Sequence, residues 1–233
     1  MAVLLAGLLA ADFFAADFFA GVEAEADELA ASERRFATLR EWLASFGPQP
    51  DIDVVGNAEY RALVAELASK SISLVRDPGG LLPVRWSSVG RVLAVMPRPT
   101  DLTPADTSST VEPALAAALR RYHGDVDEVV VEPEPDAASI AAIRSRAETA
   151  DLAVIGTIDG HRLRSQLDLV EAIAATGMPT IAVALRGPWD VGAYPAAVTA
   201  LATYSILPGS LDALAAVLAG DADASGRLPV AVS

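Results

Sequence analysis

Three short runs of consecutive apolar residues decide most strongly what this chain can fold into. The runs VLAVM (92–96), LAVIG (152–156) and TIAVAL (180–185) show no alternation of polar and apolar side chains. Strands of this kind are buried on both faces, as in a parallel sheet that is covered by helices on either side. The three runs therefore predict an α/β fold with a mostly parallel sheet at its centre.

Strand-like and helix-like segments alternate along the chain from residue 58 onward. This alternation predicts a doubly wound, mostly parallel sheet of five to six strands with helices on both faces. Right-handed crossovers would place the carboxyl end of every strand on one rim. The expected strands are 72–75, 91–96, 128–131, 152–156, 180–185 and 200–204, and the expected helices lie near 58–70, 110–122, 136–149, 162–176 and 209–219.

The segment before the α/β region is predicted to be helical. No proline occurs before Pro48, so we expect a helical extension over 1–46, a linker over 47–57 and the α/β domain over 58–233. The opening MAVLLAGLLAA has no basic residue before Arg34, and its apolar run is far shorter than the roughly 20 residues of a membrane span. It therefore predicts neither a signal peptide nor a transmembrane helix, and no compartment other than the default cytoplasm. Apolar stripes that would need covering are formed by Leu4, Leu5, Leu8, Leu9 and Phe13 and by Leu29, Phe36, Leu39, Leu43 and Phe46.

Composition excludes several classes of function. The formal net charge of -14 disfavours nucleic acids and anionic membranes as partners. The chain has no cysteine and only two histidines, so no metal site is expected. Gly79-Gly80 lacks the spacing of a dinucleotide-binding loop and reads as a turn, and no G-x-S-x-G elbow is present. No cofactor is therefore expected.

Several segments together resemble one known domain. They are ELASKSISLVRDPGGLLPV (66–84), GTIDGHRLRSQLDLVEAIAATGMPTIAVALRGPWDVGAYP (156–195), ATYS (202–205), SLDALAAVLAG (210–220) and GRLPV (226–230). In order and spacing they resemble the C-terminal α/β domain of glycoside hydrolase family 3. The ATGMP, ALRGPWD and ATYS variants look more like β-N-acetylhexosaminidases than β-glucosidases. ERRFATLREWLASFGP (33–48) resembles the helix that closes the barrel domain of such enzymes.

The resemblance implies a role in carbohydrate hydrolysis without implying activity of the chain by itself. The barrel of such enzymes carries the nucleophilic Asp and, in the N-acetylglucosaminidase branch, a His-bearing loop resembling KHFPGHGDT. Neither pattern occurs in this sequence. Only 57 residues precede the α/β region, whereas a (β/α)8 barrel needs about 250 residues. We therefore expect no catalytic residue in this chain.

Three hypotheses follow for function and partners. The chain is a structural or carbohydrate-contacting accessory domain without activity of its own, or half of a split glycosidase that needs a separate barrel subunit, or an unrelated small-molecule binding domain on a doubly wound fold. The N-terminal helices would fold back on the α/β domain, form a homo-oligomer or bind a barrel domain.

Ligands of open α/β sheets bind outside the carboxyl ends of the strands, and candidate residues cluster in two of the loops expected there. Aromatic faces suit sugar rings, and charged groups suit hydroxyls. In the alternative, a purely structural turn, Arg186 would pair with Asp190, and Trp189 would cover the edge of the core. Ser165 falls inside an expected helix, which argues against a catalytic triad, and Gln166 is expected to bond a neighbouring loop. The candidates for substrate contact are Asp159, His161, Arg186, Trp189 and Asp190.

Overall fold

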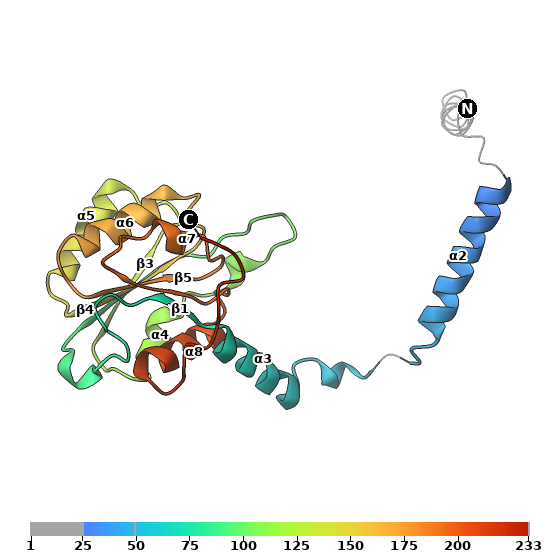
Figure 1. Ribbon diagram of the computed structural model, residues 1–233, viewed down its shortest axis with the longest axis horizontal. Coiled ribbons are helices and arrows are strands. Elements are labelled where there is room, and N and C mark those ends of the chain that lie inside the picture. Colours follow the sequence, from blue (N-terminus) through green and yellow to red (C-terminus); the bar gives the residue numbers. More distant parts are fainter. Residues whose placement is uncertain (1–25, 49, 233) are drawn as a thin grey trace, which may run out of the picture. The chain divides into compact units, whose positions relative to one another are not determined.

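The computed structural model describes residues 26–48 and 50–232. The chain divides into two compact units, with the boundary between Val55 and Gly56 in the sequence. The second unit is the α/β domain, and its elements are arranged in three layers (Figure 1). The first unit contains one long helix.

Six strands form one sheet in the order β1-β6-β5-β4-β2-β3. Neighbouring strands from β6 to β3 are parallel, which confirms the predicted doubly wound, mostly parallel sheet. Strand β4 pairs in register with both β2 and β5 and is buried along its whole length. The strands are β1 (Ser73–Arg76), β2 (Val92–Pro97), β3 (Val126–Val131), β4 (Leu152–Thr157), β5 (Thr180–Ala184) and β6 (Thr199–Ala202).

Strand β1 departs from the prediction that all strands end on one rim. It pairs antiparallel with β6, opposite Leu201 and Ala202, so its carboxyl end points to the other rim. Leu74 is 39% exposed, because β1 is an edge strand. The handedness rule applies to crossovers between parallel strands, and the chain enters β1 directly from the preceding helix. Nothing in that rule fixes the direction of this strand.

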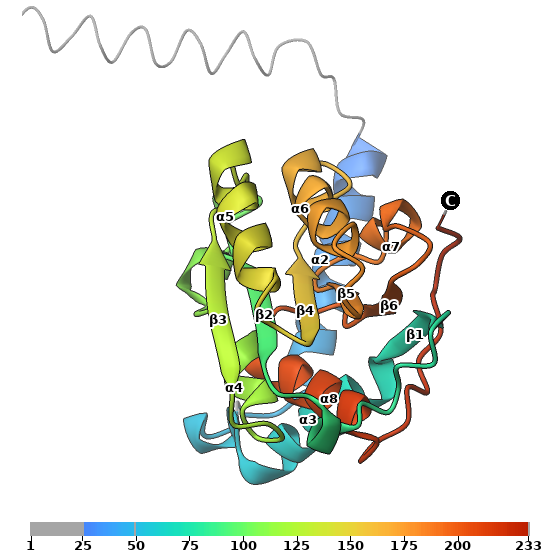
Figure 2. The same cartoon turned by 90° about the vertical axis from the view of Figure 1, so that its left-hand side faces the viewer.

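Helices cover both faces of the sheet (Figure 2). On one face, α3 (Ala58–Ser71), α4 (Leu115–Leu119) and α8 (Pro208–Ala219) contribute to a core with the buried side chains of Leu119, Leu201 and Leu214. On the other face, α5 (Ala137–Ala147), α6 (Arg164–Ala174) and α7 (Asp190–Ala193) pack on a second core that contains Ile155 and Ile173. Short 3-10 helices are η1 (Ile52–Val54), η2 (Trp86–Ser88) and η3 (Ser108–Thr110).

Local sequence signals explain several of these boundaries. Asn57 caps α3 by accepting from the Tyr60 amide, and Asp136 caps α5 by accepting from the Ser139 amide. Helix α4 is shorter than the predicted 110–122. Because Glu112 precedes Pro113, it is held out of the helical region, and Thr110 ends a separate 3-10 turn.

The first unit contains α2 (Ala26–Ala44), which ends before the predicted stop at Gly47. The five side chains predicted to form its apolar stripe, from Leu29 to Phe46, are between 47% and 65% exposed. Trp42 is also half exposed, and its ring meets that of Phe46 edge-on. The part of the predicted extension that contains Leu4, Leu5, Leu8, Leu9 and Phe13 lies outside the described residues. None of the described helices is long and apolar enough to span a bilayer.

Candidate functional site

The carboxylate of Asp190 organises the rim at the ends of β4 and β5. This side chain is 1% exposed, and it begins the short helix α7. Its Oδ2 accepts from Thr157 Oγ1 at 2.5 Å and from the Gly160 amide at 2.9 Å. Its Oδ1 accepts from the amide and from Nδ1 of His161, both at 2.8 Å. One buried carboxylate therefore fixes the loop that follows β4.

The local backbone permits this close approach. Asp159 adopts a left-handed conformation with φ of 57°, which turns the next peptide toward Asp190. A Cβ at Gly160 would lie 3.2 Å from Asp190 Oδ2, so glycine leaves room for the carboxylate. The sequence TIDGH thus makes a tight turn around an acceptor that comes from another loop.

Asp190 also orients the ring of His161. A carboxylate only accepts hydrogen bonds, so the proton of this interaction sits on Nδ1 and a neutral ring leaves Nε2 as an acceptor. The ring centroid of Trp189 lies 5.6 Å away. Behind the carboxylate, Tyr194 OH lies 2.6 Å from Thr157 Oγ1, and burial, together with the charge of Asp190, raises the pKa of this phenol well above its usual value.

Arg186 joins two loops of the rim. Its Nη1 donates to Asp159 Oδ2 at 3.0 Å, and its Nη2 donates to the carbonyl of Thr100 at 3.1 Å. The expectation of a local pair between Arg186 and Asp190 is therefore wrong. The two charges are close in sequence, but Asp190 turns inward to bind the β4 loop, whereas Arg186 reaches across the rim.

The structure divides the five predicted site residues into two groups. His161 and Trp189 line a cavity of about 300 Å³, together with Arg164 and Leu167. Asp190 supports this cavity from beneath. Trp189 is 52% exposed, so about half of its surface is available for contact. Asp159 and Arg186 lie on the other side of the β4 loop and form the second group.

Two residues of α6 behave as the sequence indicated. Ser165 lies in the first turn of the helix, and its buried hydroxyl has no hydrogen-bond partner among the described residues, so it forms no triad with His161. The buried amide of Gln166 accepts from the Ile158 amide and donates to the carbonyls of Pro133 and Ile158. It therefore ties the β3 and β4 loops together.

Sequence reasoning missed the buried partners of the site, Thr157, Tyr194 and Thr100. Thr157 is the last residue of β4, and Tyr194 belongs to the YP pair after α7. Both residues are close in sequence to Asp159 or Asp190, so their part in the site could have been suspected. Thr100 contributes a backbone carbonyl, for which the sequence carries no signal.

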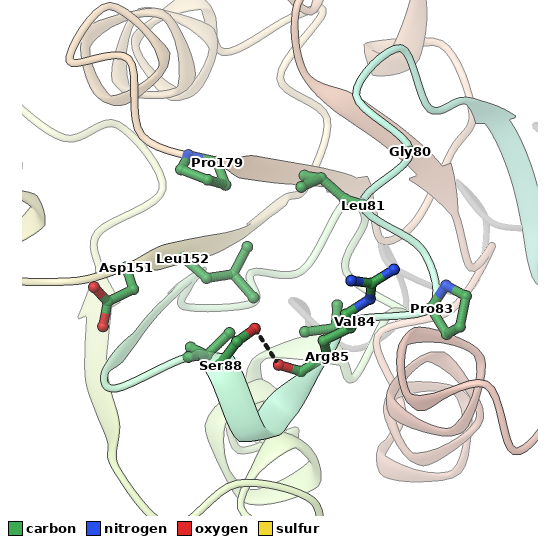
Figure 3. A pocket seen from close by; sticks show the side chains of 10 residues that line it. Gly80, Leu81, Pro83, Val84, Arg85, Ser88, Asp151, Leu152 and Pro179 are labelled. Atoms are coloured by element: carbon green, nitrogen blue, oxygen red, sulfur yellow. Dashed lines mark hydrogen bonds between the residues drawn. The ribbon is translucent and has the colours of Figure 1, made fainter.

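A further cavity, of about 280 Å³, lies at the opposite end of the sheet, between the turn before η2 and the starts of β4 and β5 (Figure 3). Its carboxylate, Asp151, already accepts from the amides of Gly90 and Arg91. The Ser88 hydroxyl donates to the carbonyl of Arg85 at 2.8 Å. The rings of Trp86 and His123 stack at this end, with centroids 5.8 Å apart, but neither side chain lines the cavity. Within residues 26–48 and 50–232, no group of three or more His, Asp or Glu side chains could hold a metal ion.

The sequence of the chain matches one known protein family. The profile of the glycosyl hydrolase family 3 C-terminal domain matches residues 72–233, most of the chain. The chain therefore belongs to the glycosyl hydrolase family 3 C-terminal domain family. No curated protein matches the chain.

Several larger solved structures contain a region similar to this chain. A family 3 β-N-acetylglucosaminidase from Paenibacillus sp. str. FPU-7 is 25% identical with a TM-score of 0.79, and the match covers 92% of this chain and 42% of that chain. A fungal multi-domain family 3 β-N-acetylglucosaminidase is 21% identical with a TM-score of 0.75, covering 94% and 25%. A β-glucosidase from Listeria innocua shares the fold at 16% identity and a TM-score of 0.61, covering 76% and 27%. The chain thus spans less than half the length of each.

Proposed function

We propose that this chain serves as the accessory C-terminal domain of a β-N-acetylhexosaminidase-like glycoside hydrolase, acts beside a barrel domain and has no activity alone. The observation that carries this proposal is the family match over 72–233 together with the similarity to the Paenibacillus β-N-acetylglucosaminidase. The α/β unit begins only at Gly56, so a match over 92% of the chain extends upstream of it. This extent supports the interpretation that α2 and the linker correspond to a segment that leads out of a barrel.

The carboxylates of the rim support an accessory role. Retaining glycosidases use two carboxyl groups about 5–5.5 Å apart, of which one attacks the sugar. Asp190 is buried and accepts four hydrogen bonds, and Asp159 is bonded to Arg186. Neither of these two carboxylates is free to act as a nucleophile. We therefore propose that another domain supplies the chemical step.

The role proposed for the rim is contact with a sugar. The indole of Trp189 offers an apolar face, and the adjacent imidazole of His161 offers Nε2 to a hydroxyl. Asp159, Arg186 and Asp190 hold the loops that carry these two rings. A sugar on this rim would lie at the edge of the domain, where a barrel could reach it.

The first test is turnover of an aryl N-acetyl-β-glucosaminide. The full chain alone is expected to give no hydrolysis above background, because its sequence lacks the barrel motifs that carry the nucleophile, whereas a family 3 barrel domain should turn over faster with the chain than without it. The barrel alone is the control. Turnover by the chain alone that survives repurification, and that disappears when one Asp or Glu of this chain is replaced, would contradict the proposal.

The second test separates sugar contact from a structural role. Trp189→Ala is expected to weaken binding of N,N′-diacetylchitobiose by about two- to tenfold, since an aromatic contact contributes about 0.5–1.5 kcal/mol. The midpoint of urea unfolding should change little, because the ring is half exposed. Trp42→Ala is the matched control, as this ring is exposed to a similar degree in α2. Unchanged binding, or losses of binding and stability in equal measure, would favour a structural turn.

Two alternatives have specific support. The exposed apolar side chains of α2 would equally fit a second copy of the chain, since surfaces of this kind mark interfaces. Light scattering of the chain alone distinguishes this homo-oligomer from a chain that associates only with a barrel. A glycan-binding module without a barrel partner would bind chitobiose but leave barrel turnover unchanged.

A further inference from the structure

The crevice between β2 and β4 is a second candidate binding site. The connection after β2 leads to β3, whereas the connection after β4 leads to β5 on the opposite side, so the loops after these neighbouring strands diverge. Open α/β sheets bind ligands at such a point, outside the carboxyl ends of the strands. A cavity of about 250 Å³ lies there, lined by residues of the β2, β3 and β4 loops. It is separate from the cavity that contains His161 and Trp189.

The walls of this crevice are held in place by polar contacts. Arg186 joins the β2 and β4 loops, which form two walls of the crevice, because it donates to both the Thr100 carbonyl and the Asp159 carboxylate. The Gln166 amide braces the floor by its bonds to Pro133 and Ile158. The cavity is therefore pre-formed, as ligand sites usually are.

The β2 loop is pinned by two carboxylates of its own. Asp101 accepts from the amide and the hydroxyl of Ser109, at 2.7 and 2.8 Å. Asp106 accepts from the Leu102 amide and from Ser108, and these hydrogen bonds lower the pKa of Asp106 to about 2. Asp106 therefore remains ionised near neutral pH, and the oxygens of both acids are engaged within the loop.

The arginines that line the crevice form fewer hydrogen bonds and ion pairs than the acids that line it. Arg162 lines the cavity, and its guanidinium forms no ion pair or hydrogen bond with any described residue. Arg98 also lines it, and its nearest acidic partner, Glu132, lies 3.9 Å away with both side chains more than half exposed. The lining acids Asp101 and Asp159 are already bonded to Ser109 and Arg186. Two arginines whose guanidinium groups make few contacts with described residues therefore line one cavity, in a chain whose formal net charge is -14.

We propose that the crevice between β2 and β4 binds the carboxylate or phosphate group of a small anionic ligand through Arg162 and Arg98. Planar guanidinium groups match the geometry of carboxylate and phosphate oxygens. The cavity is slightly below the roughly 300–1,000 Å³ of sites for drug-sized molecules, so it suits one sugar ring or a short acid. This proposal does not depend on the accessory role in glycoside hydrolysis.

Calorimetric titration of the full chain tests the proposal with three probes: glucuronate, inorganic phosphate and neutral glucose. Glucuronate, phosphate or both should bind at least about tenfold more tightly than glucose, because hydrogen bonds to charged groups are the stronger ones. Binding of glucuronate without phosphate would identify a carboxylate ligand, and the reverse would identify a phosphate ligand. Binding of neither, or binding of glucose as tight as that of both anions, would overturn the proposal.

Two arginine variants locate the bound anion. Arg162→Gln should weaken binding by at least about tenfold, whereas Arg162→Lys should retain part of it. Arg144→Gln on α5 is the matched control, since Arg144 is an exposed arginine with no ion pair among the described residues and does not line the cavity. Equal losses in Arg162→Gln and Arg144→Gln would show unspecific attraction to the protein surface and refute the site.

Discussion

Replacing Asp190 by alanine is expected to lower the free energy of unfolding by about 3–5 kcal/mol, because several donors at a buried site would lose a charged acceptor. Four donors would lose their acceptor: the Thr157 hydroxyl, the Gly160 amide, and the amide and Nδ1 of His161. Leaving a buried donor unsatisfied costs about 1–3 kcal/mol, and water entering the space would recover part of this cost. Urea unfolding measures the change.

Two further variants show whether the loss comes from this cluster. Asp190→Asn should give an intermediate loss, because the amide retains one acceptor oxygen but presents hydrogens to the other donors. Asp168→Ala is the matched control. Asp168 pairs with Arg164 on the exposed side of α6, where an ion pair contributes about 0–1 kcal/mol. If Asp190→Ala and Asp168→Ala unfold at the same urea concentration, Asp190 does not hold the rim together.

The predictable parts of the fold are those in which burial dictates residue type over several positions. Continuous apolar runs indicated β2, β4 and β5 because both faces of these strands are covered. The caps Asn57 and Asp136 were predictable because they satisfy backbone amides three residues further along the chain. Both signals are local, so one sequence contains them completely.

The parts that could not be predicted depend on contacts between distant segments. The direction of β1 follows from its pairing with β6, more than 120 residues further along the chain. Sequence proximity favoured a pair between Arg186 and Asp190, whereas Arg186 binds Asp159, 27 residues away. Both partners of Arg186 lie on other loops, so only the assembled rim determines them.

The closing motif GRLPV also depends on a contact between segments that are distant in sequence. Its glycine, Gly226, donates its amide to the carbonyl of Ile72 at 2.9 Å, which fixes the C-terminal segment beside the start of β1. A Cβ at this position would overlap the carbonyl oxygen of Ser71 and would lie 2.6 Å from Ser73 Oγ. The motif therefore requires glycine because two backbone segments touch there, not because of an unusual turn.

Gly226→Ala is accordingly expected to destabilise the domain by about 1–3 kcal/mol, the usual cost of adding a methyl group where no space exists. The backbone of Ser71 cannot yield by rotation of a side chain, so either the hydrogen bond to Ile72 lengthens or the end of α3 moves. Thermal unfolding followed by circular dichroism measures the loss. Gly124→Ala is the matched control, since a Cβ there meets nothing within 4 Å. If both variants unfold at the same temperature, the C-terminal segment is free to leave β1 and the close approach at Gly226 contributes nothing to stability.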